Sequence, residues 1–244
     1  MPSSPNLNEL KLTRELVARA HRVVADPGPP ADRVPMTEAD YERLVEAALS
    51  RAAPNEDIWL FAYGSLIWNP ACESVEHRPA VVHGWHRSFC LKLVRYRGSA
   101  ERPGLMMALD RGGLCRGLAY RIAREDAAAA LSSVMRREIS MKPMANQPRW
   151  LTTLINGERR PALGFVINRD ISTYVGRLSP EESAHLIATG CGHWGSCAEY
   201  LLNTVLKLEE HGIRDRNLWR LQALVAERLA AKDEVVRESH SVRN

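Results

Sequence analysis

One carboxylate in this 244-residue chain falls on the apolar face of an amphipathic helix. Residues 125–139 have helical periodicity, with an apolar stripe at Ala127, Ala130, Leu131 and Val134. At about 100° per residue, Glu138 lies in the middle of this stripe. A glutamate is rarely buried without a partner or a function. In a partly desolvated cleft, its raised pKa would suit proton exchange near neutral pH.

Two structural explanations for Glu138 remain open from periodicity alone. The carboxylate can pair with an arginine such as Arg97 or Arg149, or the helix can end early and leave the side chain solvated. Because structural ion pairs are common, the spacing by itself slightly favours these explanations over catalysis.

A second candidate is the break in the apolar run Ile58–Ala62. This run is rich in aromatic and β-branched residues, which predicts a buried strand, and it stops near Gly64-Ser65. Successive backbone N–H groups after a strand can bind a carboxylate or a developing oxyanion. A tight turn between two core strands explains the same pattern, and local pattern alone favours that explanation.

Two further chemistries are possible but poorly supported. Four potential zinc ligands gather near residue 190: His185, Cys191, His193 and Cys197. Their Cys-x-His-x3-Cys spacing is a poor match to structural zinc sites. Cys90 and Cys115 alternate with apolar strand residues, so we expect buried small hydrophobes rather than nucleophiles. We therefore expect no metal and no cofactor.

Composition limits the class of protein. The net charge of +4 is mild, so Arg95, Arg97 and Arg102 do not predict a nucleic-acid surface. We find no apolar run long enough to span a bilayer and no signal peptide, which predicts no membrane partner. Five cysteines, an odd number at irregular spacing, indicate reduced thiols and a cytoplasmic protein. The sequence does not determine the oligomeric state.

The elements around these candidates predict three regions. Helices at residues 7–24 and from Thr37 onward form a helical N-terminal extension, residues 1–55, which is too small to fold alone. Residues 56–232 form the main domain: strands from 58 to 120, the helix bearing Glu138, a hairpin across Asn156-Gly157, and C-terminal helices. Ser179, Ser196 and Asp215 are expected to cap those helices. Residues 233–244 form a polar tail.

Six ordered blocks resemble the ChaC family of glutathione-specific γ-glutamylcyclotransferases. They are Tyr63–Pro70, Val82–Leu91, Tyr96–Gly104, Cys115–Arg121, Arg136–Glu138 and Pro148–Trp150. The resemblance implies an α+β fold, in which a mixed, largely antiparallel sheet curls toward a barrel with helices packed outside. It also implies a small-molecule substrate, glutathione or another γ-glutamyl compound, which closes its own five-membered ring and releases 5-oxoproline.

The resemblance assigns residues to roles. It makes Glu138 the catalytic acid/base. Catalysis then becomes the favoured explanation, whereas periodicity alone favoured the structural ones. It makes the loop after the first strand the substrate-binding segment: Ala62, Tyr63, Gly64, Ser65, Leu66 and Ile67. Arg97 is the candidate for a substrate carboxylate, although a solvated charge on a strand is an equal alternative.

The chain departs from the family pattern in one segment. Many members follow the glutamate with a Gly-Gly-Tyr-like turn, whereas residues 139–147 are longer here and contain no tyrosine. Ala62 also replaces a common glycine. These departures keep two alternatives open, namely a cyclotransferase for other γ-glutamyl amino acids or amines, and a non-catalytic protein that binds a γ-glutamyl ligand.

Overall fold

The computed structural model describes residues 10–241, with side chains through Ala231. Its contacts divide the chain into two compact units, each built from segments distant in sequence. Residues 29–91 and 107–176 form the barrel unit. The described residues up to 28, residues 92–106 and the described residues from 177 onward form the helical unit.

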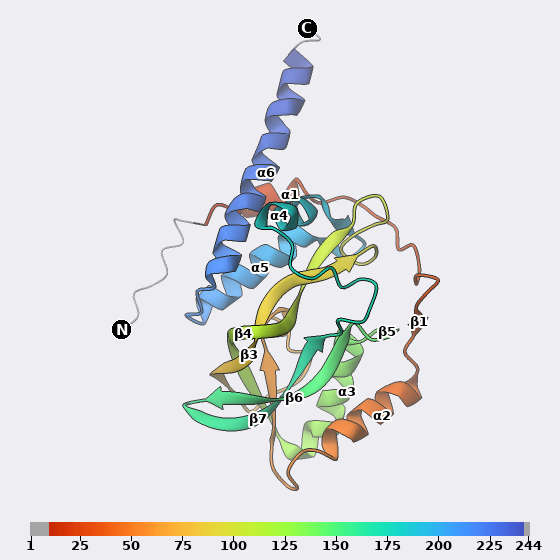
Figure 1. Ribbon diagram of the computed structural model, residues 1–244, viewed down its shortest axis with the longest axis vertical. Helices are drawn as coiled ribbons and strands as arrows, with labels where there is room; N and C mark the ends of the chain where they lie inside the picture. The colour runs from red at the N-terminus through yellow and green to blue at the C-terminus, as the bar shows by residue number, and fades with distance from the viewer. Residues whose placement is uncertain (1–9, 242–244) are drawn as a thin grey trace. The chain divides into compact units, whose positions relative to one another are not determined.

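A closed barrel is the centre of the barrel unit (Figure 1). Its strands run in the order β2-β4-β3-β6-β7. Their bounds are β2 Ile58–Ala62, β3 Glu76–Leu93, β4 Gly104–Ile122, β6 Asn146–Ile155 and β7 Glu158–Ile167. The ends of β3 and β4 at residues 92–93 and 104–106 belong to the helical unit. The β2–β4, β3–β6 and β6–β7 pairs are antiparallel, whereas β7 meets β2 and β4 in parallel. The predicted mixed, largely antiparallel sheet is confirmed.

The β6–β7 hairpin turns at the two residues that the sequence indicated. Asn156 has φ 52° and Gly157 has φ 83°, the left-handed conformations that this tight turn requires. Ten residue pairs follow in register from Ile155–Glu158 to Asn146–Ile167. The hairpin prediction is therefore confirmed.

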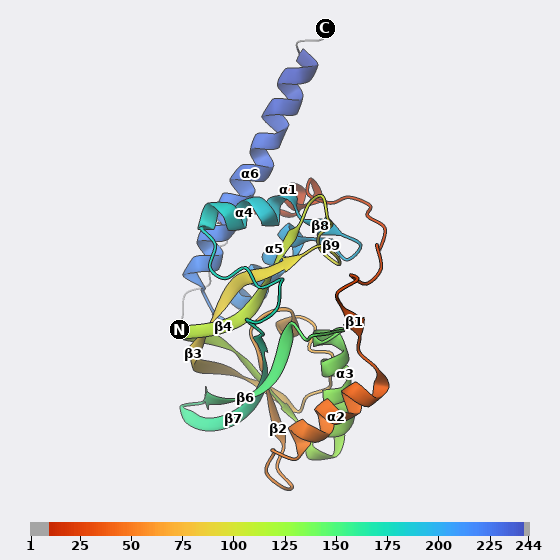
Figure 2. The same cartoon turned by 45° about the vertical axis from the view of Figure 1, so that its right-hand side comes forward.

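Two helices accompany the barrel in this unit (Figure 2): α2, Glu38–Leu49, and α3, Ala127–Glu138. Thr37 caps α2 in a reciprocal capping box with Asp40, which confirms the predicted cap. A 3₁₀ turn at Arg124–Asp126 joins β4 directly to α3. The short strand β1, Val34–Pro35, pairs with β5, Met141–Lys142, immediately after α3.

The helical unit contains α1 Arg14–Ala18, α4 Pro180–Thr189, α5 Cys197–Glu210, α6 Arg216–Ser241 and the small pair β8 Cys191–Gly192 with β9 Gly195–Ser196. The three predicted caps are confirmed. Ser179 forms a capping box with Glu182 on α4, and Ser196 accepts the Glu199 N–H on α5. Asp215 accepts the amides of Asn217 and Leu218 at the start of α6. This last helix continues to Ser241, into the region expected to be a polar tail.

The helix predicted over residues 7–24 is wrong in length. Residues 7–9 lie outside the described residues, and α1 covers only Arg14–Ala18. The amides of Lys11 and Leu12 donate to Gln222 Oε1 at 3.1 and 2.8 Å. Thr13 then caps the helix through Leu16 N–H. Gln222 on α6 thus accepts the two N–H groups that would donate within the helix if the helix began earlier.

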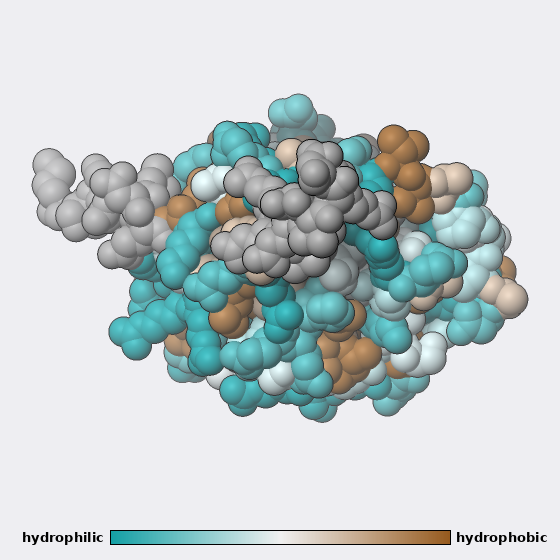
Figure 3. Space-filling view, turned by 90° about the horizontal axis from the view of Figure 1, so that it is seen from above, coloured by the Kyte–Doolittle hydropathy of each residue, from teal (hydrophilic) through white to brown (hydrophobic). Residues whose placement is uncertain are grey.

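The predicted division of the chain into residues 1–55, 56–232 and 233–244 remains a prediction. Residues 29–55 share the barrel unit with the strands, whereas the described residues before 29 belong to the helical unit. Polar side chains dominate the face seen in Figure 3, where hydrophobic ones are scattered. No helix among the described residues combines the length and apolarity that a membrane span requires.

Candidate active site

Glu138 is the last residue of α3, and its side chain is only 14% exposed. Burial raises the pKa of this carboxyl from its ordinary 4.5 to about 6. The Arg137 guanidinium, with Nε 3.5 Å from Oε1, opposes this rise. The group can therefore exchange a proton near neutral pH.

The inward direction of Glu138 follows from the helix stripe, as predicted. Ala127, Ala130, Leu131 and Val134 are all buried. The predicted arginine partners have other contacts: the Arg149 guanidinium lies 5.7 Å from the Trp85 ring centre, and Arg97 pairs with Glu199. The helix does not end before Glu138. The early helix end is therefore wrong, and neither Arg97 nor Arg149 is the partner of Glu138. The carboxylate does pair with an arginine, its neighbour Arg137, so a structural ion pair stays open beside catalysis.

The segment after β2 forms a single 3₁₀ turn at Ser65–Ile67. Gly64, with φ −136° and ψ −129°, does not take the positive φ that glycine permits. The Ile67 amide donates to Gly64 O at 2.9 Å. In the described residues, the backbone hydrogen bonds leave the Ser65 and Leu66 amides without an acceptor. These are the groups that a helical start normally leaves unpaired, and such groups can bind an anion.

Three residues on neighbouring strands hold this turn in place. The buried Arg87 donates from Nε to Tyr63 O at 2.7 Å, and its Nη2 donates to Arg116 O. The Tyr120 hydroxyl donates to Ile67 O at 3.0 Å. Gly117 lets the strands approach, because a Cβ there would lie 2.2 Å from Ala62 O. The turn therefore has fixed carbonyls at both ends.

Chain order brings Glu138 and this turn to the same end of the barrel unit. β2 and β4 are antiparallel, with Ile58 opposite Ile122, so β4 ends where β2 begins. α3 starts five residues later and runs back alongside the barrel (Figure 2). Twelve helical residues and five strand residues each span roughly 17–18 Å. Both elements therefore finish at the end of the barrel where β6 begins.

Arg97, the third sequence candidate, belongs to the helical unit. Its Nη1 donates to Ser196 O and to Glu199 Oε2, both at 2.8 Å. Gly104 closes this region tightly, since a Cβ there would lie 2.4 Å from Arg97 O and 2.6 Å from Cys197 Sγ. The role of Arg97 in binding a substrate carboxylate remains a prediction.

Sequence reasoning missed Arg87 and Tyr120. Arg87 alternates with Phe89 and Leu91, which are both buried, so it lies on a core-facing side of β3. A charge at such a position is the signal that could have identified it. Tyr120 gave no such signal, because a buried tyrosine on a strand is ordinary.

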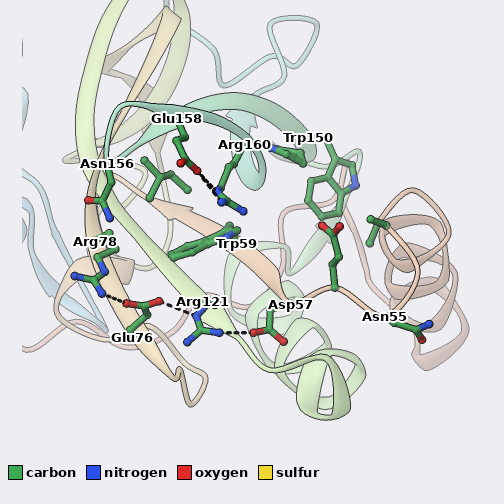
Figure 4. A pocket seen from close by; sticks show the side chains of 15 residues that line it. Asn55, Asp57, Trp59, Glu76, Arg78, Arg121, Trp150, Asn156, Glu158 and Arg160 are labelled. Carbon is green, nitrogen blue, oxygen red and sulfur yellow. Dashed lines mark hydrogen bonds and ion pairs between the residues drawn. The ribbon is translucent and has the colours of Figure 1, made fainter.

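A pocket of about 570 Å³ lies elsewhere in the barrel unit (Figure 4). It is lined around the β6–β7 turn and the start of β2, including Trp59, Trp150, Arg121, Arg78 and Arg160. β6 runs from Asn146, whose amide contacts Glu138 O at 3.4 Å, to Ile155 in the pocket, roughly 30 Å away along the strand. The pocket arginines pair with Asp57, Glu76 and Glu158. It is not the candidate site.

The zinc alternative finds no support among the described residues, where no cluster of His, Cys, Asp and Glu is placed to hold a metal ion. His193 instead lies 3.7 Å from Asp26, and Cys197 Sγ contacts Arg97 O at 3.1 Å. Cys90 and Cys115 are buried, as predicted for small hydrophobes. Burial raises the pKa of the Cys90 thiol to about 12, which keeps it protonated.

The ChaC-like protein family matches residues 58–228. The chain belongs to this family. The matched range contains Glu138, the turn after β2 and Arg97, but it begins after β1 and α2. The family recognition made from the six sequence blocks is confirmed.

Two relatives and one solved structure agree with this ChaC-like assignment. The glutathione-specific γ-glutamylcyclotransferase of Escherichia coli K12 is 36% identical over 186 residues, covering 75% of this chain and 80% of that protein. Glutathione-specific γ-glutamylcyclotransferase 1 of Homo sapiens is 28% identical, covering 71% and 77%. A crystal structure of the yeast glutathione-specific enzyme matches with a TM-score of 0.63 at 21% identity, covering 71% and 97%. This last likeness shows a shared fold.

Proposed function

We propose that this ChaC-like chain is a glutathione-specific γ-glutamylcyclotransferase that releases 5-oxoproline and Cys-Gly. Relatives that bear this name cover most of the chain. The observation that carries the mechanism is the largely desolvated Glu138 carboxyl, 14% exposed, whose pKa is raised to about 6 at the end of α3.

The reaction needs no nucleophile from the protein. The α-amine of the γ-glutamyl group attacks its own γ-carbonyl carbon, and the bond from that carbon to the cysteine nitrogen breaks. Ring closure is intramolecular, so orientation of the substrate supplies much of the rate enhancement. No water is consumed, and the atoms of glutathione divide between the two products.

Glu138 would carry the proton through the reaction. In its ionised form it takes a proton from the α-ammonium group, which makes the amine nucleophilic. In its protonated form it returns that proton to the departing nitrogen of Cys-Gly. A pKa near 6 suits both steps, because each form is accessible near neutral pH.

The Ser65 and Leu66 amides would hold substrate oxygen. Charge develops on the γ-carbonyl oxygen as the ring closes, and fixed N–H donors stabilise that charge. Arg87 and Tyr120 keep the donors in place through Tyr63 O and Ile67 O. Arg97 would meet a substrate carboxylate, since an arginine has donors beyond the Nη1 group that contacts Ser196 and Glu199.

The test is turnover of glutathione by Glu138→Gln, with 5-oxoproline and Cys-Gly quantified by mass spectrometry. The variant keeps the size and polarity of the side chain but cannot exchange the proton. We expect a loss of at least about 10²-fold in kcat with folding preserved. Glu46→Gln, at an exposed position on α2, is the control and should retain wild-type turnover. Turnover by Glu138→Gln near the wild-type rate would sink the mechanism.

Other γ-glutamyl amino acids or amines are the alternative substrates, because residues 139–147 lack the tyrosine of the common family turn. Comparing kcat/KM for glutathione and for such compounds distinguishes the two. A non-catalytic binder would instead release no 5-oxoproline from any of them. We also propose a cytoplasmic location, which agrees with five free cysteines.

A further inference from the structure

Glu138 occupies a position that helices rarely hold firmly. It is the last residue of α3, and Ile139 after it is already extended, with φ −133° and ψ 101°. The final carbonyls of a helix lack partners within the helix, and its last turn frays. The placement of Glu138 therefore depends in part on the segment that follows it.

Residues 33–41 contact each of the five residues after Glu138, from Ile139 to Pro143. The Tyr41 hydroxyl donates to Ile139 O at 2.9 Å, and the Met36 amide donates to Ser140 O at 3.1 Å. β1 pairs with β5, placing Val34 opposite Lys142 and Pro35 opposite Met141. Arg33 Nη1 donates to Pro143 O at 2.7 Å.

One ion pair fastens the same two segments through side chains. Lys142 Nζ lies 2.5 Å from Asp40 Oδ2, and Asp40 is buried. Asp40 also closes the capping box of α2 with Thr37, so the lysine is tied to the start of a helix. The Lys142 ammonium is the largest influence that lowers the pKa of Asp40, which keeps this pair charged through the acid range.

We propose that residues 33–41 are a positioning element, with Tyr41 and Asp40 as positioning residues, that holds the Glu138 carboxyl in its buried place. This inference rests on the proposed function of Glu138. The element lies before residue 58, where the family match begins, and it holds the segment in which the chain departs from the common family pattern.

The pKa of Glu138 reports whether its carboxyl stays in place, provided that the charged groups near it are taken into account. Arg137 lies beside the carboxyl on α3, and Asp40 and Lys142 come from the segments packed at the end of that helix. Asp40 also pairs with Arg43 on α2, at 2.5 Å, so it keeps a charged partner when Lys142 is removed. Loss of the Lys142 charge would by itself raise the pKa of Glu138, which is opposite to the shift that added water would cause. A loosened Glu138 gains water, and its pKa then returns toward the ordinary 4.5.

The experiment measures kcat, KM and the acid limb of the kcat–pH profile for Tyr41→Phe and Lys142→Met, with glutathione as substrate. We expect kcat to fall about tenfold, with KM changed less than about threefold, because misplacing a reacting group costs rate more than binding. We expect the midpoint of the acid limb to move from about 6 toward 4.5. Lys142→Arg should restore both quantities, because it can reach the same carboxylate.

Matched controls remove equivalent groups elsewhere. Tyr174→Phe deletes a hydroxyl that donates to Asp110, and Lys207→Met breaks a surface pair with Glu210. Both should leave the acid limb at its wild-type midpoint. A purely structural role for residues 33–41 predicts a lower Tm in Tyr41→Phe and Lys142→Met with an unmoved acid limb, and that result would overturn the inference, whatever happens to kcat.

Failure of this inference is distinguishable from failure of the proposed function. If Glu138→Gln abolishes turnover while Tyr41→Phe and Lys142→Met keep the wild-type kcat and limb, the positioning role is wrong and the catalytic role stands. If Glu138→Gln retains turnover, the catalytic role fails, and the positioning role fails with it.

Discussion

The buried Arg87 guanidinium donates a 2.7 Å hydrogen bond from Nε to the carbonyl oxygen of Tyr63. Its Nη2 group reaches Arg116 O on β4. One charged side chain therefore connects the turn after β2 with the strand beside it. A buried charge is costly unless it is hydrogen-bonded, so this arrangement fixes the turn rather than merely packing against it.

Arg87→Met should destabilise the protein and impair turnover. The buried carbonyl of Tyr63 and the part-buried carbonyl of Arg116 lose their donor, and a buried unsatisfied group costs about 1–3 kcal/mol. We expect a loss of at least about 2 kcal/mol in the free energy of unfolding by urea titration, and a fall in kcat/KM of at least tenfold. Arg87→Lys should recover only part of either loss, because one ammonium group cannot donate to both carbonyls as the planar guanidinium does. Wild-type kcat/KM in Arg87→Met would show that the turn does not need this tie.

Gly117→Ala should displace the same turn from the other side. The added Cβ would lie 2.2 Å from Ala62 O, which is backbone and cannot move cheaply. We expect about 1–3 kcal/mol of destabilisation, measured by urea unfolding, with a reduced kcat/KM.

Gly164→Ala is the matched control for that substitution. Its Cβ would meet Leu151 Cδ1 at 2.6 Å, the far end of a side chain that can change rotamer. The control should cost less stability and preserve kcat/KM. Equal losses in the two variants would mean that crowding in the barrel core, and not displacement of the turn, explains the effect.

Glu138 should make stability depend on pH. Its folded pKa of about 6 exceeds the ordinary 4.5, so the folded state binds more protons between these values. Stability from this group is therefore complete below pH 4.5 and falls as the pH rises to about 6, by about 2 kcal/mol in total.

Glu138→Gln removes this titration. Its free energy of unfolding should lack the decrease between pH 4.5 and 6 that the wild type shows, so at pH 7 the variant gains relative to the wild type. Urea unfolding at pH 4.5, 6 and 7 measures the difference. Parallel pH curves for the two proteins would contradict the burial of an ionisable carboxyl at this position.

Arg97→Met tests the weakest of the site predictions. If Arg97 binds a substrate carboxylate, KM for glutathione should rise at least about tenfold while kcat changes little. Loss of the contacts to Ser196 and Glu199 should lower stability as well. Glu199→Gln weakens the ion pair but keeps the guanidinium, so its KM should stay near the wild-type value. A normal KM in Arg97→Met would reduce the residue to a structural role.

The local signals in the sequence were sufficient for much of the fold. Asn156-Gly157 determined a hairpin, because few other residues take positive φ at adjacent positions. Thr37, Ser179, Ser196 and Asp215 determined helix starts, because each side chain satisfies amides within its own first turn. The inward direction of Glu138 followed from helical periodicity, which is equally local.

What depends on distant parts of the chain was decided only by the tertiary structure. Helix α1 is short because Gln222, more than two hundred residues away, takes the amides of Lys11 and Leu12. Arg87 became a support for the turn because β4 lies beside β3 in a closed barrel. The tie between Tyr41 and Ile139 spans 98 positions, and neither residue signals it by type or spacing. Local preferences act within a turn of chain, whereas these contacts arise only when folding brings separate segments together.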